Sequence, residues 1–171
     1  RMSSEFHAEL AQQVRRFCKD KIWPHAEEDD RLERFRMEVF TGLGELGLAG
    51  MTLPESLGGS GLGYQDLCLG LSEVARASIS YAVTLSVSGM VQGIINEHGT
   101  PAQKQKFIPE LAQGLGIGAF ALTESGAGSD AAGLKTTAKK AQGGYVLQGN
   151  KMFITSAGLA KTYLVMARTG G

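Results

Sequence analysis

The chain has 171 residues with 17 basic and 17 acidic side chains, so its formal net charge is zero. That balance argues against a dedicated nucleic-acid binder, which needs a basic surplus to neutralise phosphates. With 43% hydrophobic and 20% charged residues, the composition excludes disorder as the main state.

The N-terminal segment predicts an amphipathic helix that Ser3 or Ser4 caps and that runs to Ile22, where Pro24 ends or kinks it. Its apolar residues recur at steps of four, four and three, which is one face of a helix. They are Phe6, Leu10, Val14 and Phe17. We expect the acidic run Glu27–Asp30 to form a solvated helix end or a loop.

Four further helices are predicted before residue 115, with one long glycine-rich loop among them. The helical ranges are 37–48, 66–77, 79–97 and 101–111, and the loop is 53–63. No charged residue lies between Arg76 and Glu97, so we expect helix 79–97 to be buried on most sides.

After Gln113 the periodicity changes from helical to alternating, and four strands are predicted: 117–123, 136–140, 145–153 and 163–168. Gly143-Gly144 suits a hairpin turn between the second and third strands. The predicted class is therefore α+β, with an N-terminal all-α helical domain at 1–115 and an incomplete antiparallel β domain at 116–171. Since the chain stops soon after the fourth strand, we expect it to be a piece of a longer protein.

Two segments match the dinucleotide-binding pattern G-x-G-x-x-G/A, but neither lies between a strand and a helix as that pattern requires. They are 42–47 and 126–131. The second segment still offers consecutive small residues whose backbone N–H groups can converge on an anion. An ordinary connection between strands explains it slightly better on chemistry alone.

The sequence supports no hydrolase, nucleotide-triphosphatase or metal chemistry. The histidines at 7, 25 and 98 are far apart and carry no paired carboxylate pattern, so we expect them at surfaces or helix ends. Neither a nucleophile elbow nor a phosphate-loop lysine occurs. Cys18 and Cys68 are isolated, as thiols of a reducing compartment are. Glu124 is the tempting general base, but a single carboxylate beside a glycine-rich turn is more often structural.

Four stretches in a fixed order carry a family resemblance: 53–63, 71–75, 122–130 (LTESGAGSD) and 150–158 (NKMFITSAG). Together they resemble the acyl-CoA dehydrogenases, over essentially the whole chain. The third stretch, followed by the fourth about 25 residues later, is the most specific part of the likeness. The sequence departs from the family's common residues at Ser125, Phe153 and Ser156, where Pro, Trp and Asn are usual.

The resemblance implies FAD as cofactor, in a cleft that the β domain helps to form, and oxidation of an acyl-CoA to the trans-2-enoyl-CoA. Carried over by position, the cofactor-binding residues are Phe120, Leu122, Thr123, Gly128, Ser129, Phe153, Ile154 and Thr155. Thr155 would lie near the reactive flavin nitrogen, and Ser129 would also lie beside the acyl-CoA. Phe153 would pack on the flavin ring.

The resemblance also implies a carboxylate base in a C-terminal domain that this chain lacks, so we expect residues 1–171 alone to be inactive. We expect the acyl tail near the uncharged helix, with Val87 and Met90 facing it. Electron-transfer flavoprotein is the expected electron acceptor, and the full-length protein is expected to be a homo-oligomer without a membrane span. The expected location is the bacterial cytoplasm or the mitochondrial matrix. A flavin-dependent oxidase or monooxygenase, or a non-catalytic helical interaction module, remains as an alternative.

Overall fold

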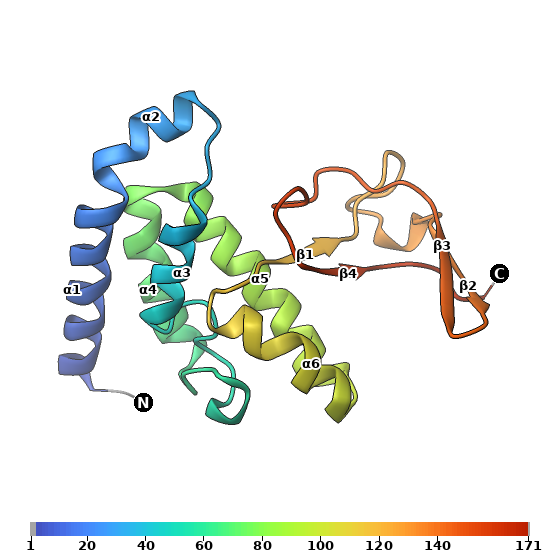
Figure 1. The fold of residues 1–171 in the computed structure, drawn as a ribbon, viewed down its shortest axis with the longest axis horizontal. Helices are drawn as coiled ribbons and strands as arrows, with labels where there is room; N and C mark the ends of the chain where they lie inside the picture. The colour runs from blue at the N-terminus through green and yellow to red at the C-terminus, as the bar shows by residue number, and fades with distance from the viewer. Residues whose placement is uncertain (1–2, 171) are drawn as a thin grey trace.

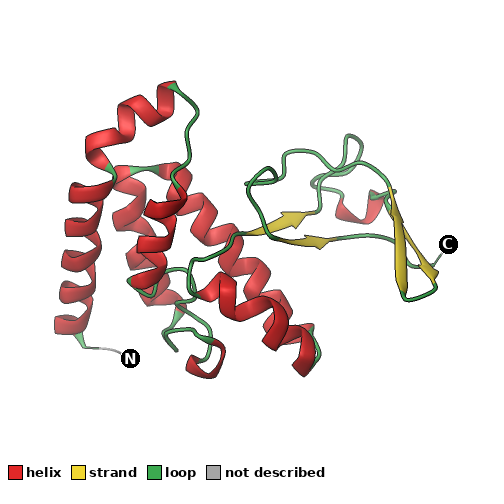
Figure 2. Cartoon of the chain, in the orientation of Figure 1, coloured by secondary structure: helices red, strands yellow, loops and turns green. Residues whose placement is uncertain are grey.

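A computed structural model describes residues 3–170 and shows helices at one end and paired strands at the other (Figures 1 and 2). The helices are α1 (Ser4–Lys21), α2 (Ala26–Arg31), α3 (Met37–Glu45), α4 (Tyr64–Ala77), α5 (Ile79–His98) and α6 (Pro101–Ala112). The strands are β1 (Gly118–Ala121), β2 (Thr137–Ala141), β3 (Gly144–Gln148) and β4 (Thr162–Val165). The α+β class, helices first, is confirmed.

Helix α1 forms as its sequence pattern predicts. The Ser3 hydroxyl accepts from the Phe6 amide at 3.1 Å, and the helix buries Leu10, Val14 and Cys18 against the core. It is joined to α4 by polar pairs as well. Arg15 binds Glu73 through two bonds of 3.0 and 2.8 Å, and His7 Nε2 lies 2.8 Å from Asp66 Oδ1. No sequence pattern indicated this His7 contact, because the carboxylate partner is 59 residues away along the chain.

Of the two alternatives for the acidic run, the structure shows the solvated helix: the run makes up most of α2 and is largely exposed. Glu27, Glu28 and Asp29 lie in its first turn, where negative charge interacts favourably with the helix dipole. Helix α5 is less buried than its uncharged sequence predicts. Leu85 and Val91 lie in the core, whereas Val83 and Met90 are 41% and 42% exposed. The uncharged stretch of α5 therefore has two apolar faces, one packed in the core and one open to solvent.

The strands form two separate pairs. β2 and β3 are antiparallel and turn through Gly143, whose φ is +79°, as the glycine pair predicts. β1 and β4, in contrast, are parallel, so an all-antiparallel sheet was the wrong prediction for this pair. β3 ends at Gln148, before the predicted end at Phe153, whose left-handed backbone with φ 57° does not fit a strand.

Helix α5 packs against β1, beside which it lies in Figure 1. The fully buried Ser88 hydroxyl accepts from the Gly118 amide at 3.0 Å. A Cβ atom at Gly118 would lie only 3.0 Å from the Val91 side chain of α5, so a larger residue there would force Val91 to shift. The first strand is thus held on the helical domain, and the loop that follows it begins at a fixed place.

Candidate functional site

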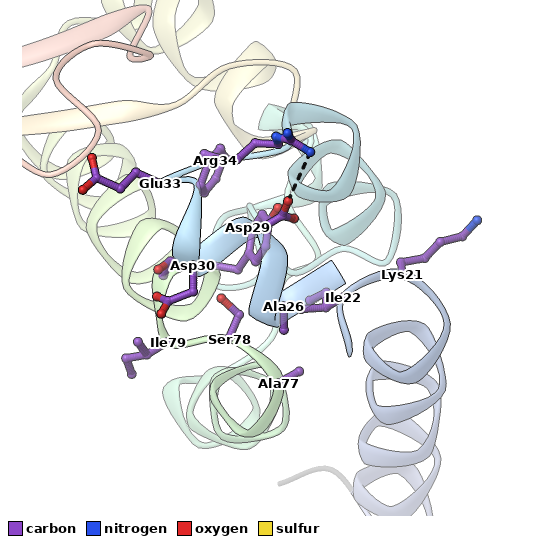
Figure 3. Close-up of a pocket in the computed structure, with 13 residues that line it drawn as sticks. Lys21, Ile22, Ala26, Asp29, Asp30, Glu33, Arg34, Ala77, Ser78 and Ile79 are labelled. Atoms are coloured by element: carbon purple, nitrogen blue, oxygen red, sulfur yellow. Dashed lines mark ion pairs between the residues drawn. The ribbon is translucent and has the colours of Figure 1, made fainter. Parts of the chain in front are cut away.

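A cavity of about 500 Å³ at the helical end contains none of the predicted site residues. Figure 3 shows its labelled side chains, with carboxylates from Asp29, Asp30 and Glu33 around it. Asp29 is neutralised: Arg36 binds it at 2.6 and 2.8 Å and lowers the pKa of its carboxyl, and Arg34 lies 3.7 Å away. No cluster of three metal-ligating side chains occurs within residues 3–170.

The loop after β1 forms a tight turn whose tip is open to solvent. Backbone bonds of 2.8 and 3.2 Å join Glu124 and Ala127, and the two residues between them are exposed. Gly128 and Ser129 follow, also exposed, and within residues 3–170 their backbone N–H groups donate to no protein atom. The loop therefore presents free donors to an external acceptor.

Glu124 is bound on both carboxylate oxygens. Lys151 Nζ donates to Oε1 at 2.7 Å, and the amides of Lys135 and Thr136 donate at 2.6 and 2.9 Å. The Lys151 ammonium, more than any other group, holds the pKa of the Glu124 carboxyl far below its ordinary value. A carboxylate that is ionised and bound in this way is a poor proton acceptor, so its role is structural.

The same lysine brings two distant motifs together. Lys151 Nζ also donates to the Leu122 carbonyl at 2.8 Å, and the Met152 amide donates to the Thr123 carbonyl at 2.9 Å. Segment 150–156 therefore lies along the start of the loop that follows β1. The predicted residues Leu122 and Thr123 are placed beside the segment that holds Phe153, Ile154 and Thr155.

Phe153 is the most exposed large hydrophobic residue of the described chain, at 85%, and its backbone is left-handed with φ +57°. Thr155 and Ser156 line a groove of about 420 Å³ that the first two turns of α5 complete. The groove is lined by Phe35, Ile79, Ser80, Val83, Thr84, Thr155, Ser156 and Leu159. It has apolar walls with hydroxyl groups among them.

Val87 and Met90, the predicted substrate-facing pair, do not line this groove. They lie four and seven residues beyond Val83, which places them on the same face of α5. Val87 is half-buried and Met90 is exposed. The groove therefore opens onto an apolar helix face that continues toward both residues.

Three contributors to this arrangement were missed from the sequence: Lys151, Thr84 and Ser156. Thr84 is one of several hydroxyl residues on α5, and Ser156 is a common residue type with a left-handed backbone. Only Lys151 carries a signal that could have been read, because a cation next to apolar residues 152–154 needs a partner when it is buried.

Comparisons with known proteins agree with one another. The family model described as "Acyl-CoA dehydrogenase, N-terminal domain" matches residues 4–115, and "Acyl-CoA dehydrogenase, middle domain" matches residues 119–171. The mitochondrial isovaleryl-CoA dehydrogenase of Arabidopsis thaliana is 41% identical over 94% of this chain and 40% of its own length. The chain thus spans about 40% of the length of such curated relatives.

Two solved structures show the same arrangement of the backbone. A glutaryl-CoA dehydrogenase from Mycobacterium smegmatis in complex with FADH2 superimposes with a TM-score of 0.92 at 30% identity, over 98% of this chain and 43% of that one. A chain in the solved structure of the electron transferring flavoprotein of Acidaminococcus fermentans gives 0.93 at 32% identity, over 99% and 45%.

Proposed function

Because the chain belongs to the acyl-CoA dehydrogenase family, we propose that it supplies the flavin-facing loop and the acyl-binding helix of an FAD-dependent acyl-CoA dehydrogenase. The proposal places the domain boundary between residues 115 and 116. The observation that carries it is the exposed Phe153 ring beside a loop with free backbone donors.

These residues suit a flavin. An aromatic ring that water surrounds on nearly all sides costs free energy unless a flat ligand covers it. The free N–H groups of Gly128 and Ser129 suit a phosphate or another electron-rich group. The residues that would hold FAD are Phe120, Leu122, Thr123, Gly128, Ser129, Phe153, Ile154 and Thr155.

Bound FAD would supply the hydride acceptor for oxidation of the acyl-CoA at its β-carbon. The chain's own residues would orient the reactants for that transfer. Hydroxyls of Thr123 and Thr155 can donate to electron-rich edges and stabilise negative charge that grows there. Ser129 would serve both the cofactor and the acyl-CoA, since its side chain is exposed at the end of the loop.

The acyl tail would lie along the open face of α5, with Val87 and Met90 setting its reach. That face carries no charge to stabilise an ionised acyl group. We therefore expect unbranched or branched hydrocarbon tails, as in isovaleryl-CoA, to be preferred over a carboxylate-bearing tail such as glutaryl-CoA.

The α-proton needs a base that Glu124 does not provide, because its carboxylate is fully engaged. We infer that the base lies in a part of the full-length protein outside these residues and that this chain alone is inactive. Electron-transfer flavoprotein as acceptor, a homo-oligomer, and a mitochondrial or bacterial-cytoplasmic location complete the proposal. None of the helices within residues 3–170 has the length and apolarity needed to cross a membrane.

FAD titration into the full-length apoprotein tests the cofactor site. We expect saturable binding with a red-shifted, quenched flavin, and clearly weaker binding for Phe153→Ala because the packing face is lost. The exposed Tyr145→Ala on β3 is the matched control and should bind like the wild type. Full-length protein that takes up no flavin would contradict the proposal and leave a non-catalytic interaction module.

A further inference from the structure

Two of the three non-glycine residues with a left-handed backbone in residues 3–170 lie three positions apart, at Phe153 and Ser156. Their φ values are +57° and +61°. Such residues persist only where the surrounding structure holds them, and they concentrate at functional sites. We call the segment 153–156 the arch.

The arch is fixed at both ends, by different parts of the molecule. At its start, Lys151 and Met152 bond to the carbonyls of Leu122 and Thr123, which anchors it to the loop after β1. At its end, the Ser156 hydroxyl lies 3.4 Å from the Thr84 hydroxyl of α5, and either can donate. Thr84 is 4% exposed, so few other partners are open to it.

The backbone after the arch supports the same geometry. The Ser156 carbonyl accepts from the amides of Leu159 and Ala160 at 2.9 and 2.8 Å. Its carbonyl and its side chain are both occupied, one by the following turn and the other by α5. Ser156 is thus the point where the arch, the turn and the helix meet.

We propose that Thr84 and Ser156 are positioning residues: their hydroxyl pair sets the arch, and with it Thr155, against the acyl-binding helix. The inference rests on the proposed function, since it assigns these residues a role toward the flavin and the acyl-CoA. A ligand that binds a prearranged arch pays less to order it, so the pair raises affinity without touching the cofactor. It also couples the position of α5 to the position of the arch.

Flavin affinity and substrate kinetics of the full-length protein test the proposal. Thr84→Val keeps the shape and removes the hydroxyl, and we expect FAD to bind about fivefold more weakly, the typical effect of one lost hydrogen bond. Thr84→Ser should restore binding, which a purely space-filling role of Thr84 would not require. Ser86→Ala, exposed on the same helix, should match the wild type.

A double-mutant cycle isolates the pair. Thr84→Val and Ser156→Ala should each weaken FAD binding, and the double variant should be no weaker than the poorer single variant. Both should raise the KM for acyl-CoA more than they lower kcat. Additive losses of FAD affinity in the double variant would overturn the positioning role, and so would single variants whose FAD affinity and KM are both unchanged. In either case a wild-type protein that binds flavin would leave the proposed function intact. A wild-type protein that binds no flavin would overturn both.

Discussion

The Lys151 ammonium nitrogen lies 2.7 Å from Glu124 Oε1, with both side chains about nine-tenths buried. This pair joins the glycine-rich loop after β1 to the segment that carries the arch, although 27 positions separate the two residues. Buried ion pairs are costly to break, because the remaining charge has no partner and no water. We therefore expect this ion pair to hold the two segments of the proposed flavin site together.

Replacing Glu124 by Gln should destabilise the fold. Lys151 would remain buried beside an uncharged amide, and we expect the Tm to fall by about 5–10 °C. The exposed pair of Lys161 and Glu110 offers a control, and Glu110→Gln should change the Tm by less than about 3 °C. Equal effects in thermal unfolding would argue against the structural role of Glu124.

Stability should fall in acid. Lys151 lowers the pKa of Glu124, Arg15 lowers that of Glu73, and the Gly63 amide, followed by His7, lowers that of Asp66. A carboxyl whose pKa is lower in the folded state stabilises the fold above its ordinary value, which is 4.5 for Glu and 3.8 for Asp. Protonation below those values removes the contribution. The Tm should be flat above about pH 6 and drop steeply below about pH 4.5.

The Glu124→Gln variant should lose less stability over the same acid range, since it lacks one of the titrating groups. Thermal unfolding followed by circular dichroism between neutral and acid pH measures both curves. A wild-type Tm that rises on acidification would contradict the lowered pKa values of these three carboxyls.

The two cysteines should differ in reactivity. Burial, with the nearby Glu73 carboxylate adding to it, raises the pKa of the Cys18 thiol to about 11, whereas Cys68 is exposed. Thiolates are the reactive form, so a thiol reagent at neutral pH should modify Cys68 and leave Cys18 untouched. Both should react in urea. Mass spectrometry measures which cysteine is modified. Rapid modification of Cys18 in the folded protein would show that this face of α1 is not buried against the core.

Larger side chains on the open face of α5 should shorten the preferred acyl chain. Val87→Trp and Met90→Trp in the full-length enzyme fill the space in which we place the end of the tail. Leu115→Trp, exposed and outside α5, is the control. The kcat/KM profile over acyl chain length should shift to shorter substrates for the first two variants alone. An unchanged profile would remove α5 from the substrate site.

Local patterns predicted most of the helical domain, because the spacing of Leu10 and Val14 and the cap at Ser3 act within a few residues. The parallel pairing of β1 with β4 was not predictable in this way, since it depends on contacts across more than 40 residues. The left-handed backbones at Phe153 and Ser156 were missed for a related reason. Neither residue type favours that conformation, and the contacts of Lys151 and Thr84 that flank it come from distant parts of the chain.

For the site, the resemblance predicts which motifs face the flavin, and the structure shows the contacts that join two of these motifs. The role of Glu124 followed from the chemistry of a lone carboxylate, but its partner could only be found in three dimensions. His7 is the same case, since nothing near it in the sequence points to Asp66.

Anaerobic addition of isovaleryl-CoA to the full-length protein loaded with FAD measures directly whether an acyl-CoA reduces the flavin. The visible flavin absorbance should bleach as enoyl-CoA forms, and reoxidation in air should be slow. Residues 1–171 alone should show no bleaching and form no enoyl-CoA. Rapid reoxidation by oxygen would favour a flavin-dependent oxidase or monooxygenase. A flavin that stays oxidised with this and every other acyl-CoA supplied would show that the protein is not an acyl-CoA dehydrogenase.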